Sequence, residues 1–462
     1  MEAITFLIGI SGFILAFLLR PIKGLFIYFV GLFWYSQYLT VSIGTIDFTV
    51  SRIIILALLA NIFFRTRLVR KFKWNLMDNL IVAYVFAQLI ALTISGNVPV
   101  GAFVERQAGS LFDTILPYFA VRFIINSKER LITFIKVLII IAIPLAVAGV
   151  YQCLTGFDPV GFMTKHFAWG YSELMTEMGN RIVPRLGFYR AYVTFPVPIS
   201  YGLFFAGLAP LCIGLWKQKI WEKLRIIVLF VLMLIGILSS MSSAPSFSIA
   251  ASMILLAFFP FTRFRGVFLL TFFMCFIIFI HLCSNLPFYE YLTRFAFSQE
   301  GAYYRINLVR EALFGGMTGH WVAGYGYVGF GPGIFENIDF NWEHTDFVNI
   351  YIGILVRYGL LGLLPFLGIN ILYYRCLYQA AKRTLNQADL WLIWCILSTL
   401  IGWNIAMMTV SAMDQVNTLL FMLIGTSCNM PYIIMMANRL RKLRKQPTSE
   451  QSLSTVNTLT AY

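Results

Sequence analysis

Long apolar runs alternate with short polar segments along the whole chain of 462 residues. A helix needs roughly 17 to 25 apolar residues to cross a bilayer, and the runs approach or reach that length. They lie near residues 4–19, 24–41, 48–64, 77–95, 108–125, 131–151, 196–216, 224–240, 245–260, 266–284, 347–374, 389–409 and 415–437. The pattern predicts an all-α, polytopic integral membrane bundle of about 12 to 13 transmembrane helices.

Two polar segments, 152–195 and 285–346, are much longer than the others. Lysine and arginine in the short segments fall on one predicted side, which the positive-inside rule assigns to the cytoplasm. The amino terminus and both long loops are then outside, and the carboxyl terminus is inside. The predicted units are the amino-terminal membrane helices (1–284, with external loop 152–195), the large external loop (285–346), the carboxyl-terminal membrane helices (347–445) and a polar, disordered tail (446–462).

Composition narrows the class of protein further. Hydrophobic residues make up 59% of the chain and charged residues only 12%, with a mean hydropathy of +0.79, which excludes a soluble globular protein. The net charge of +15 sits in short clusters between apolar runs, so nucleic-acid binding is disfavoured. The seven cysteines support neither a metal site nor a disulfide framework. The first run lacks a basic start and a cleavage site, and we expect a retained helix.

Arginine is strongly preferred to lysine on the predicted outer side. The basic residues there are Arg52, Arg106, Lys165, Arg181, Arg185, Arg190, Arg294, Arg305 and Arg310. A guanidinium group binds phosphate through two parallel hydrogen bonds, which an ammonium group cannot do. The bias therefore predicts an external anionic ligand, and a lipid-linked pyrophosphate fits. The alternative is that these arginines pair with nearby glutamates or with lipid headgroups.

The stretch from Arg305 to Gly362 places polar chemistry against the membrane. It begins with an amphipathic segment that bears Arg305 and Arg310 and predicts an interfacial helix. A run rich in glycine and aromatic residues, Gly319–Gly333, follows. Two titratable side chains, His344 and Asp346, then stand at the mouth of an apolar helix.

The order of these features resembles the O-antigen ligase/polymerase superfamily. Its members are polytopic membrane enzymes that transfer glycans from polyprenyl pyrophosphate carriers. The matching motifs are the arginine helix, Gly319-His320-Trp321, Gly324-Tyr325-Gly326-Tyr327 and Tyr358-Gly359-Leu360-Leu361-Gly362. The family's His-Asn pair falls on Val348-Asn349, and its external Ser-Arg-Gly falls in Ser242–Ser246, which contains no arginine. The resemblance implies a glycosyltransferase that acts on a polyprenyl-pyrophosphate-linked oligosaccharide.

The resemblance also implies a bacterial inner membrane location, with the site facing the periplasm or exterior. It assigns Arg305 to the pyrophosphate and Asn349 to the family's asparagine, which would bind a sugar or a neighbouring helix. A polymerase of exopolysaccharide or O-antigen is favoured, with a ligase or a flippase of lipid-linked glycans as alternatives. Membrane lipids and a chain-length regulator are the further partners it implies.

Individual residues suggest how such a reaction would proceed. His344 suits the base that activates the acceptor hydroxyl, because imidazole titrates near neutrality, and Asp346 is the other candidate. The structural alternative is that Thr345 or Asp346 caps the following helix. We expect direct displacement, which inverts the anomeric carbon. We also expect no metal or other cofactor, since the sequence contains no Asp-x-Asp motif.

Four further residues are candidate substrate contacts. Arg310 is either a second phosphate contact or the partner of an acidic residue. The rings of Trp321 and Tyr325 would stack on sugars, or they belong to a compact surface loop. Arg185 and Arg190, in the other long loop, are expected to line the same cavity.

Overall fold

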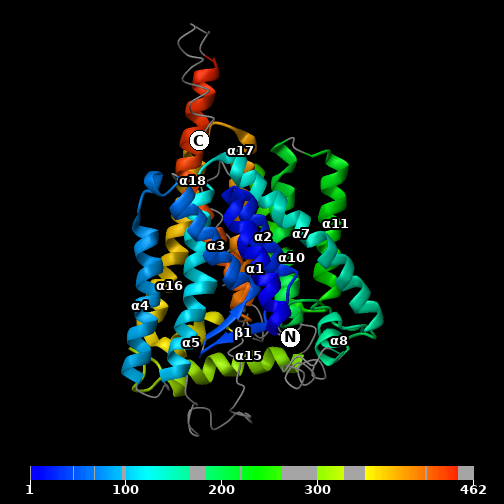
Figure 1. Ribbon diagram of the computed structural model, residues 1–462, viewed down its shortest axis with the longest axis vertical. Coiled ribbons are helices and arrows are strands. Elements are labelled where there is room, and N and C mark those ends of the chain that lie inside the picture. Colours follow the sequence, from blue (N-terminus) through cyan, green and yellow to red (C-terminus); the bar gives the residue numbers. More distant parts are fainter. Residues whose placement is uncertain are drawn as a thin grey trace, which may run out of the picture.

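The computed structural model describes residues 2–44, 46–66, 68–95, 100–166, 184–218, 221–261, 299–326, 349–410 and 414–445. These residues form a helical bundle with one short β-hairpin, so the predicted all-α membrane class is confirmed (Figure 1). Six helices in this part of the chain are long and apolar enough to span a membrane. They are α4 (Leu76–Ser95), α7 (Lys128–Thr155), α10 (Pro198–Gly214), α16 (Ile350–Arg383), α17 (Gln387–Met407) and α18 (Asp414–Lys445).

The other helices are shorter. They are α1 (Glu2–Leu18), α2 (Pro21–Phe33), α3 (Val50–Arg65), α5 (Val100–Ser110), α6 (Leu116–Ile124), α8 (Pro159–His166), α11 (Lys223–Ser239), α12 (Ser243–Ala257) and α15 (Gln299–Glu311). Single turns of 3-10 helix occur at η1 (Val69–Lys71), η3 (Trp216–Gln218) and η4 (Phe259–Phe261), and π turns at η2 (Leu111–Ile115) and η5 (Ala312–Gly316). Every predicted apolar run overlaps a helix except 266–284, which lies outside the described residues.

The prediction of one helical span over residues 24–41 is wrong. Helix α2 ends at Phe33, and the chain then forms a hairpin of β1 (Thr40–Ile43) and β2 (Ile46–Thr49). Branched residues favour strands, and Gly44 adopts a φ of +67° at the turn, where a glycine avoids strain. The hairpin lies across the start of α3, whose first turn Thr49 caps by accepting from the backbone nitrogen of Arg52.

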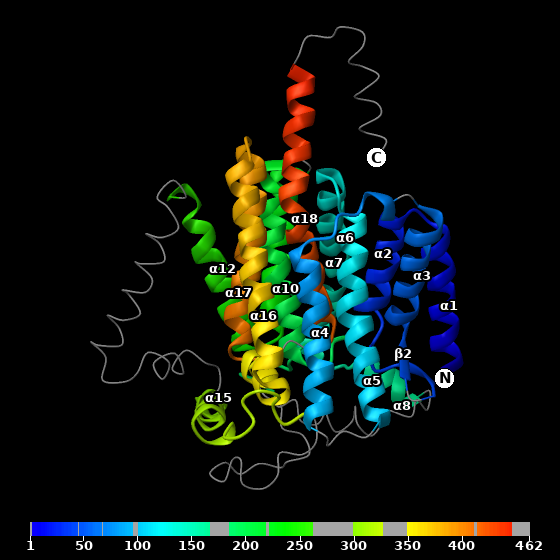
Figure 2. The same ribbon diagram turned by 90° about the vertical axis from the view of Figure 1, so that its left-hand side faces the viewer.

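Most helices run roughly along one axis, so the bundle has two distinct ends (Figures 1 and 2). One end, here called the hairpin end, holds the amino terminus, the hairpin, α8 and α15. The opposite end, here called the basic end, holds the start of α7 and the last turns of α16 and α18, with Lys128, Arg383 and Arg441. Helix α15 runs across the bundle axis, as the amphipathic pattern around Arg305 predicts.

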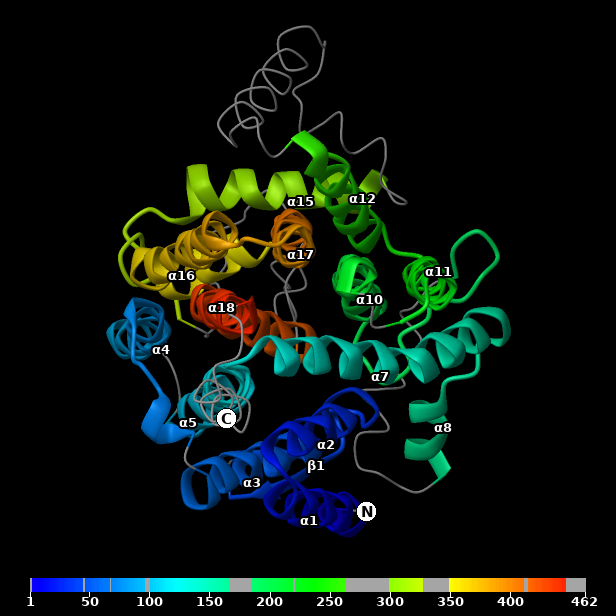
Figure 3. The same ribbon diagram turned by 90° about the horizontal axis from the view of Figure 1, so that it is seen from above.

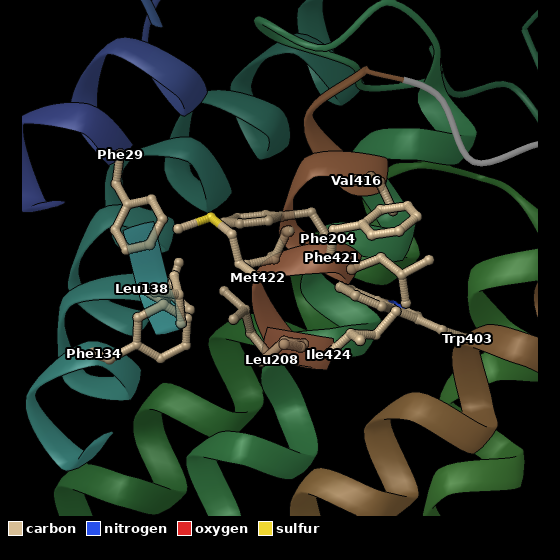
Figure 4. Packing of buried hydrophobic residues seen from close by; sticks show 14 of the residues in the cluster. Phe29, Phe134, Leu138, Phe204, Leu208, Trp403, Val416, Phe421, Met422 and Ile424 are labelled. Carbon is tan, nitrogen blue, oxygen red and sulfur yellow. The ribbon is translucent and has the colours of Figure 1, made fainter. Parts of the chain in front are cut away.

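Helix α18 lies inside the bundle, among α6, α7, α10, α16 and α17 (Figure 3). Large side chains of neighbouring helices, including Phe29, Phe204 and Trp403, form one hydrophobic core with those of α18 (Figure 4). Gly207 lets the indole of Trp403 reach the backbone of α10, where its Nε1 donates to the carbonyl of Leu203 at 2.9 Å. Close packing through small residues is how helices associate in a membrane.

Buried charges at the basic end are paired. The guanidinium of Arg122 donates from Nε and Nη2 to both carboxylate oxygens of Asp78, at 3.0 and 2.8 Å. The hydroxyl of Tyr118 donates to the same carboxylate at 2.8 Å. Asp389 likewise receives Lys128 at 2.6 Å and Arg441 at 2.7 Å, which ties α17 to α7 and α18.

Candidate functional site

A segment at the hairpin end, residues 184–197, carries two of the predicted arginines and is here called the arginine segment. Gln152, near the end of α7, accepts hydrogen bonds at its Oε1 from the backbone nitrogens of Tyr192 and Val193, both at 2.8 Å. The backbone nitrogen of Ala191 donates to the last residue of α11 at 2.9 Å. Two helix ends therefore hold the segment in place.

The backbone around the arginine segment is strained. Three non-glycine residues in the described part of the chain have positive φ, Leu186 at +53°, Val193 at +52° and Met241 at +47°. All three lie in the segment or beside its contact with the turn between α11 and α12. Such conformations cost about 1 to 3 kcal/mol each and cluster at functional sites, because only the surrounding structure maintains them.

Arg185 and Arg190 both reach the turn between α11 and α12. The Nη1 of Arg185 donates to the carbonyl oxygen of Met241 at 3.1 Å, and the Nη2 of Arg190 donates to Oγ of Ser242 at 2.9 Å. The structure thus brings these two predicted residues together at one place.

Arg305 completes what is here called the arginine cluster, together with Arg185 and Arg190. Burial, together with the positive charges of Arg185 and Arg305, lowers the pKa of Arg190 to about 10. Burial lowers the pKa of Arg185 as well. Arg185 and Arg190 stay protonated at neutral pH, so positive charge is concentrated where water is scarce.

The charge of the cluster is not neutralised at Arg185 or Arg190 by any carboxylate in the described residues. The Nε of Arg190 is inaccessible to solvent and donates no hydrogen bond to a described group. A buried donor left without an acceptor costs about 1 to 3 kcal/mol, and more when it is charged. This arrangement favours an incoming anion with several oxygen atoms.

The two arginines of helix α15, Arg305 and Arg310, lie in different environments. Arg305 is half-buried and acts on Arg190, whereas Arg310 is exposed. Leu308 of α15 and Ala312 of the π turn η5 pack in a small core with the first turns of α16. Arg310 is therefore not part of the arginine cluster.

A loop formed by residues 317–326, here called the docked loop, fits into a break in α16. The predicted continuous helix 347–374 is wrong in this respect, because Gly359 has a non-helical backbone with φ +61°. Four backbone hydrogen bonds join loop and helix: Tyr325 N to Val356 O (2.8 Å), Gly326 N to Arg357 O (2.9 Å), Leu360 N to Trp321 O (2.8 Å) and Leu361 N to Val322 O (3.1 Å). A Cβ at Gly359 would lie 2.2 Å from the oxygen of Val322.

The docked loop positions two predicted aromatic residues differently. The ring of Tyr325 stacks on His320, with centroids 3.9 Å apart, and also joins the small core beneath α15. Trp321 is 40% exposed, so its indole is accessible. An exposed indole face can stack on a sugar ring, whereas Tyr325 mainly fixes the loop.

Asn349 is the N-cap of α16. Its Oδ1 accepts from the backbone nitrogens of Tyr351 at 3.0 Å and Ile352 at 3.2 Å. The helix therefore begins at Ile350, and the prediction that Thr345 or Asp346 starts it is wrong, because asparagine satisfies the free backbone donors at this later position. His344 and Asp346 lie outside the described residues, and their roles stay predictions.

Three side chains that hold the site were missed from the sequence. Gln152 and Gln415 anchor the arginine segment, the latter through a hydrogen bond from Nε2 to the carbonyl of Thr194 at 3.2 Å. Ser242 receives Arg190. A polar amide near the end of an apolar run is itself a signal, since it needs a partner in a membrane.

Fold and composition together define the class of this chain as a multi-pass helical membrane protein. No family model matches the chain, and no curated protein matches its sequence. A fold does not determine a function, so the chemistry of the site decides which functions are reasonable.

Proposed function

We propose that the chain is a membrane glycosyltransferase that moves an oligosaccharide from a polyprenyl-pyrophosphate carrier to a glycan acceptor. The favoured reaction is the polymerisation of exopolysaccharide or O-antigen at the bacterial inner membrane, at a site open to the periplasm or exterior. The observation that supports the proposal is the arginine cluster at the hairpin end, in which Arg185 and Arg190 reach the same turn and the charges of Arg185 and Arg305 act on Arg190.

Pyrophosphate matches the chemistry of the cluster. Its oxygen atoms are strong hydrogen-bond acceptors, and guanidinium groups bind such oxygens in pairs. The solvent-inaccessible Nε of Arg190 supplies one donor that a described group does not use. When the bond between the sugar and the pyrophosphate breaks, negative charge grows on the leaving group, and fixed positive charge in a dry site stabilises it.

The acceptor side of the reaction would use residues near the start of α16. The acceptor hydroxyl oxygen attacks the anomeric carbon as the bond to pyrophosphate breaks, and its proton passes to His344 or Asp346. Trp321 would stack on a sugar of the substrate. Polyprenyl pyrophosphate leaves, and direct displacement inverts the anomeric centre.

The resemblance to the O-antigen ligase/polymerase superfamily supports the same proposal. The external turn where that family usually carries an arginine corresponds here to Ser242–Ser246, which has none. Arg185 and Arg190 reach this turn from the arginine segment. They would supply the missing guanidinium group from a different part of the chain.

A transporter or flippase of lipid-linked glycans is the second candidate. Transporters build their sites from discontinuous helices, and α16 is discontinuous at Gly359. The glycosyltransferase is preferred, because the cationic residues of the site gather at one end of the bundle. A ligase that transfers a finished chain to a lipid or other acceptor is the variant closest to the favoured reaction.

The test uses the full chain in lipid nanodiscs with a defined polyprenyl-pyrophosphate oligosaccharide, with and without EDTA. We expect a ladder of lengthening glycans that EDTA does not abolish. A single transfer to a second acceptor would identify a ligase. If a fluorescent lipid-linked glycan crosses the bilayer of proteoliposomes and no new glycosidic bond forms, the transporter is supported and the glycosyltransferase is refuted.

A further inference from the structure

A second polar site lies at the hairpin end, in a cavity of about 220 Å³ between the hairpin, α3, the π turn η2 and the start of α18. We call it the hairpin cavity. Figure 1 shows the hairpin and α5 together at this end of the bundle. Its polar lining includes Thr40, Asp47, Arg52, Glu105, Asp113 and Gln415.

Gln415 is fully buried, with 0% of its surface exposed, and lines the cavity. Its Nε2 donates to the carbonyl oxygen of Thr194 at 3.2 Å, which fixes the orientation of the amide. Its Oε1 accepts no hydrogen bond from a described residue. Since a buried acceptor without a donor costs about 1 to 3 kcal/mol, a ligand that brings a hydroxyl group into the cavity would be stabilised.

The charges of the cavity disfavour anions. Arg52 donates from Nε and Nη2 to Asp113, at 3.1 and 2.5 Å, and from Nη1 to the backbone oxygen of Asp47 at 2.6 Å. Three carboxylates, those of Asp47, Glu105 and Asp113, line the cavity with one arginine, whose guanidinium is engaged by Asp113 and by the backbone of Asp47. The Asp47 carboxylate itself accepts from Oγ of Ser42 at 2.6 Å. The cavity offers mainly acceptors, and its net charge is negative.

The geometry does not suit a metal ion. No group of three histidine, cysteine or acidic side chains in the described part of the chain is arranged to hold one. Asp113 lies in a π turn, a conformation that often marks functional sites because it reorients a side chain within a helix. A ligand that donates hydroxyl groups to carboxylate and amide oxygens fits these acceptors best.

The size of the cavity limits the ligand. A volume of 220 Å³ corresponds to about seven water molecules at ~30 Å³ each, which is the scale of one sugar ring. The amide of Gln415 also connects the cavity to the arginine segment, because Thr194 follows Arg190 by four residues. One side chain therefore joins the lining of the cavity to the segment that carries Arg185 and Arg190.

We propose that the hairpin cavity binds one uncharged sugar unit of the acceptor glycan through its hydroxyl groups. The assignment of this sugar to the acceptor rests on the proposed glycosyl transfer, whereas sugar binding itself does not. The hydroxyl groups would donate to Oε1 of Gln415 and to the carboxylates of Asp47 and Glu105. The arginine cluster would hold the anionic donor, and the hairpin cavity, negative in charge, would exclude it. The two substrates are then sorted by charge.

The experiment measures sugar binding without any donor lipid. The full chain in lipid nanodiscs, rather than in a sugar-based detergent, is mixed with the methyl glycosides of glucose, galactose, mannose and N-acetylglucosamine, and separately with glucuronate. Saturation-transfer NMR reports binding. We expect at least one methyl glycoside to bind and glucuronate to bind at least tenfold more weakly.

Gln415→Leu should raise the Kd of the bound glycoside about tenfold, because Oε1 is lost while the size of the side chain is nearly kept. The matched control is Gln218→Leu at the basic end. It also removes an amide that donates to a backbone carbonyl, because Nε2 of Gln218 donates to the oxygen of Ala388 at 2.8 Å. Its Kd should not change. If Gln415→Leu does not fold, Glu105→Gln, at an exposed side chain, should weaken the glycoside severalfold and strengthen glucuronate.

The inference is overturned if no glycoside binds, if Gln415→Leu leaves the affinity unchanged, or if glucuronate binds equally well. Sugar binding without any new glycosidic bond in the nanodisc assay would refute the proposed transferase and retain the sugar site. If glycosidic bonds form but Gln415→Leu does not change sugar binding, the sugar site is refuted and the proposed transferase is retained.

Discussion

The two ends of the bundle treat buried arginine in opposite ways. At the basic end Arg122, 5% exposed, meets both oxygens of Asp78, which is fully buried. At the hairpin end Arg190 faces Arg185 and Arg305, and its one hydrogen bond to a described residue goes to the hydroxyl of Ser242. One arrangement neutralises charge inside the protein, and the other concentrates it.

This difference separates a structural role from a functional one. A buried charge in a membrane protein is expensive, so a chain that needs only stability pairs it, as Asp78 and Arg122 do. Like charges held together by a strained segment reduce stability, and a bound anion would reverse that loss. The comparison therefore predicts that substitutions at the basic end affect folding, whereas those at the hairpin end affect ligand binding and turnover.

The largest expected effect is at the basic end. Asp78→Ala leaves the guanidinium of Arg122 buried without its carboxylate and should lower the free energy of unfolding by about 3 to 5 kcal/mol. Thermal or denaturant unfolding in nanodiscs measures this. Glu129→Ala, at an exposed residue of the same end, is the control and should change stability by less than about 0.5 kcal/mol. A loss in Asp78→Ala no larger than the control would show that the pair is dispensable.

The next effect is on turnover. Arg190→Lys keeps a positive charge but removes the planar fork, so the rate of glycosyl transfer should fall about a hundredfold, or about 2.7 kcal/mol. The melting temperature should stay the same. Arg130→Lys at the basic end, where Arg130 donates to Asn126 at 3.0 Å, should leave the rate unchanged. Equal rates for wild type and Arg190→Lys would remove Arg190 from the site.

A smaller effect concerns the docked loop. Gly359→Ala places a Cβ 2.2 Å from Val322 O at a φ of +61°, so the loop should detach at a cost of about 1 to 3 kcal/mol. Hydrogen exchange of the Tyr325 and Gly326 amides measures this directly. Gly368→Ala lies in the same helix, where the nearest side-chain atom would be 3.4 Å away, and should not increase exchange. Unchanged protection in Gly359→Ala would contradict the docked geometry.

The smallest effect is a dependence on pH. Because the pKa of Arg190 is lowered to about 10, folding is penalised while the group is charged, and the penalty fades as pH rises from about 10 towards the higher pKa of the unfolded chain. Anion binding follows the opposite course, since it needs the charge. The affinity for sulfate, whose own charge does not change in this range, should be constant from pH 7 to 9. Above pH 10 it should fall by up to about tenfold per unit. Arg190→Met should abolish this dependence, and a dependence that persists in this variant would assign it to another group.

Much of the fold follows directly from hydropathy. Apolar runs predict helices because a lipid environment requires every backbone group to be bonded within its own segment. The same rule did not predict the hairpin at 40–49, of which only the two ends fall in the apolar runs 24–41 and 48–64, or the break at Gly359. Both depend on what the segment packs against, the hairpin on α3 and the break on the docked loop.

The site was predictable in its residue types but not in its arrangement. The excess of arginine over lysine indicated Arg185, Arg190 and Arg305, and the structure places these three together. Arg310 carries the same signal but is exposed, because it is five residues further along α15 and the buried face of that helix is apolar. Gln415 could not have been linked to Thr194, which is 221 residues away in the chain.

The sequence by itself determined that this is a multi-pass helical membrane protein and which charged residues face its polar segments, because hydropathy and side-chain chemistry are local properties. Only the tertiary structure decided which charges meet a carboxylate and which meet another arginine, since Asp78 and Arg122, or Arg190 and Arg305, come together only after distant segments have packed. Coulomb energies depend on distance and on burial, and neither is fixed until the bundle has formed.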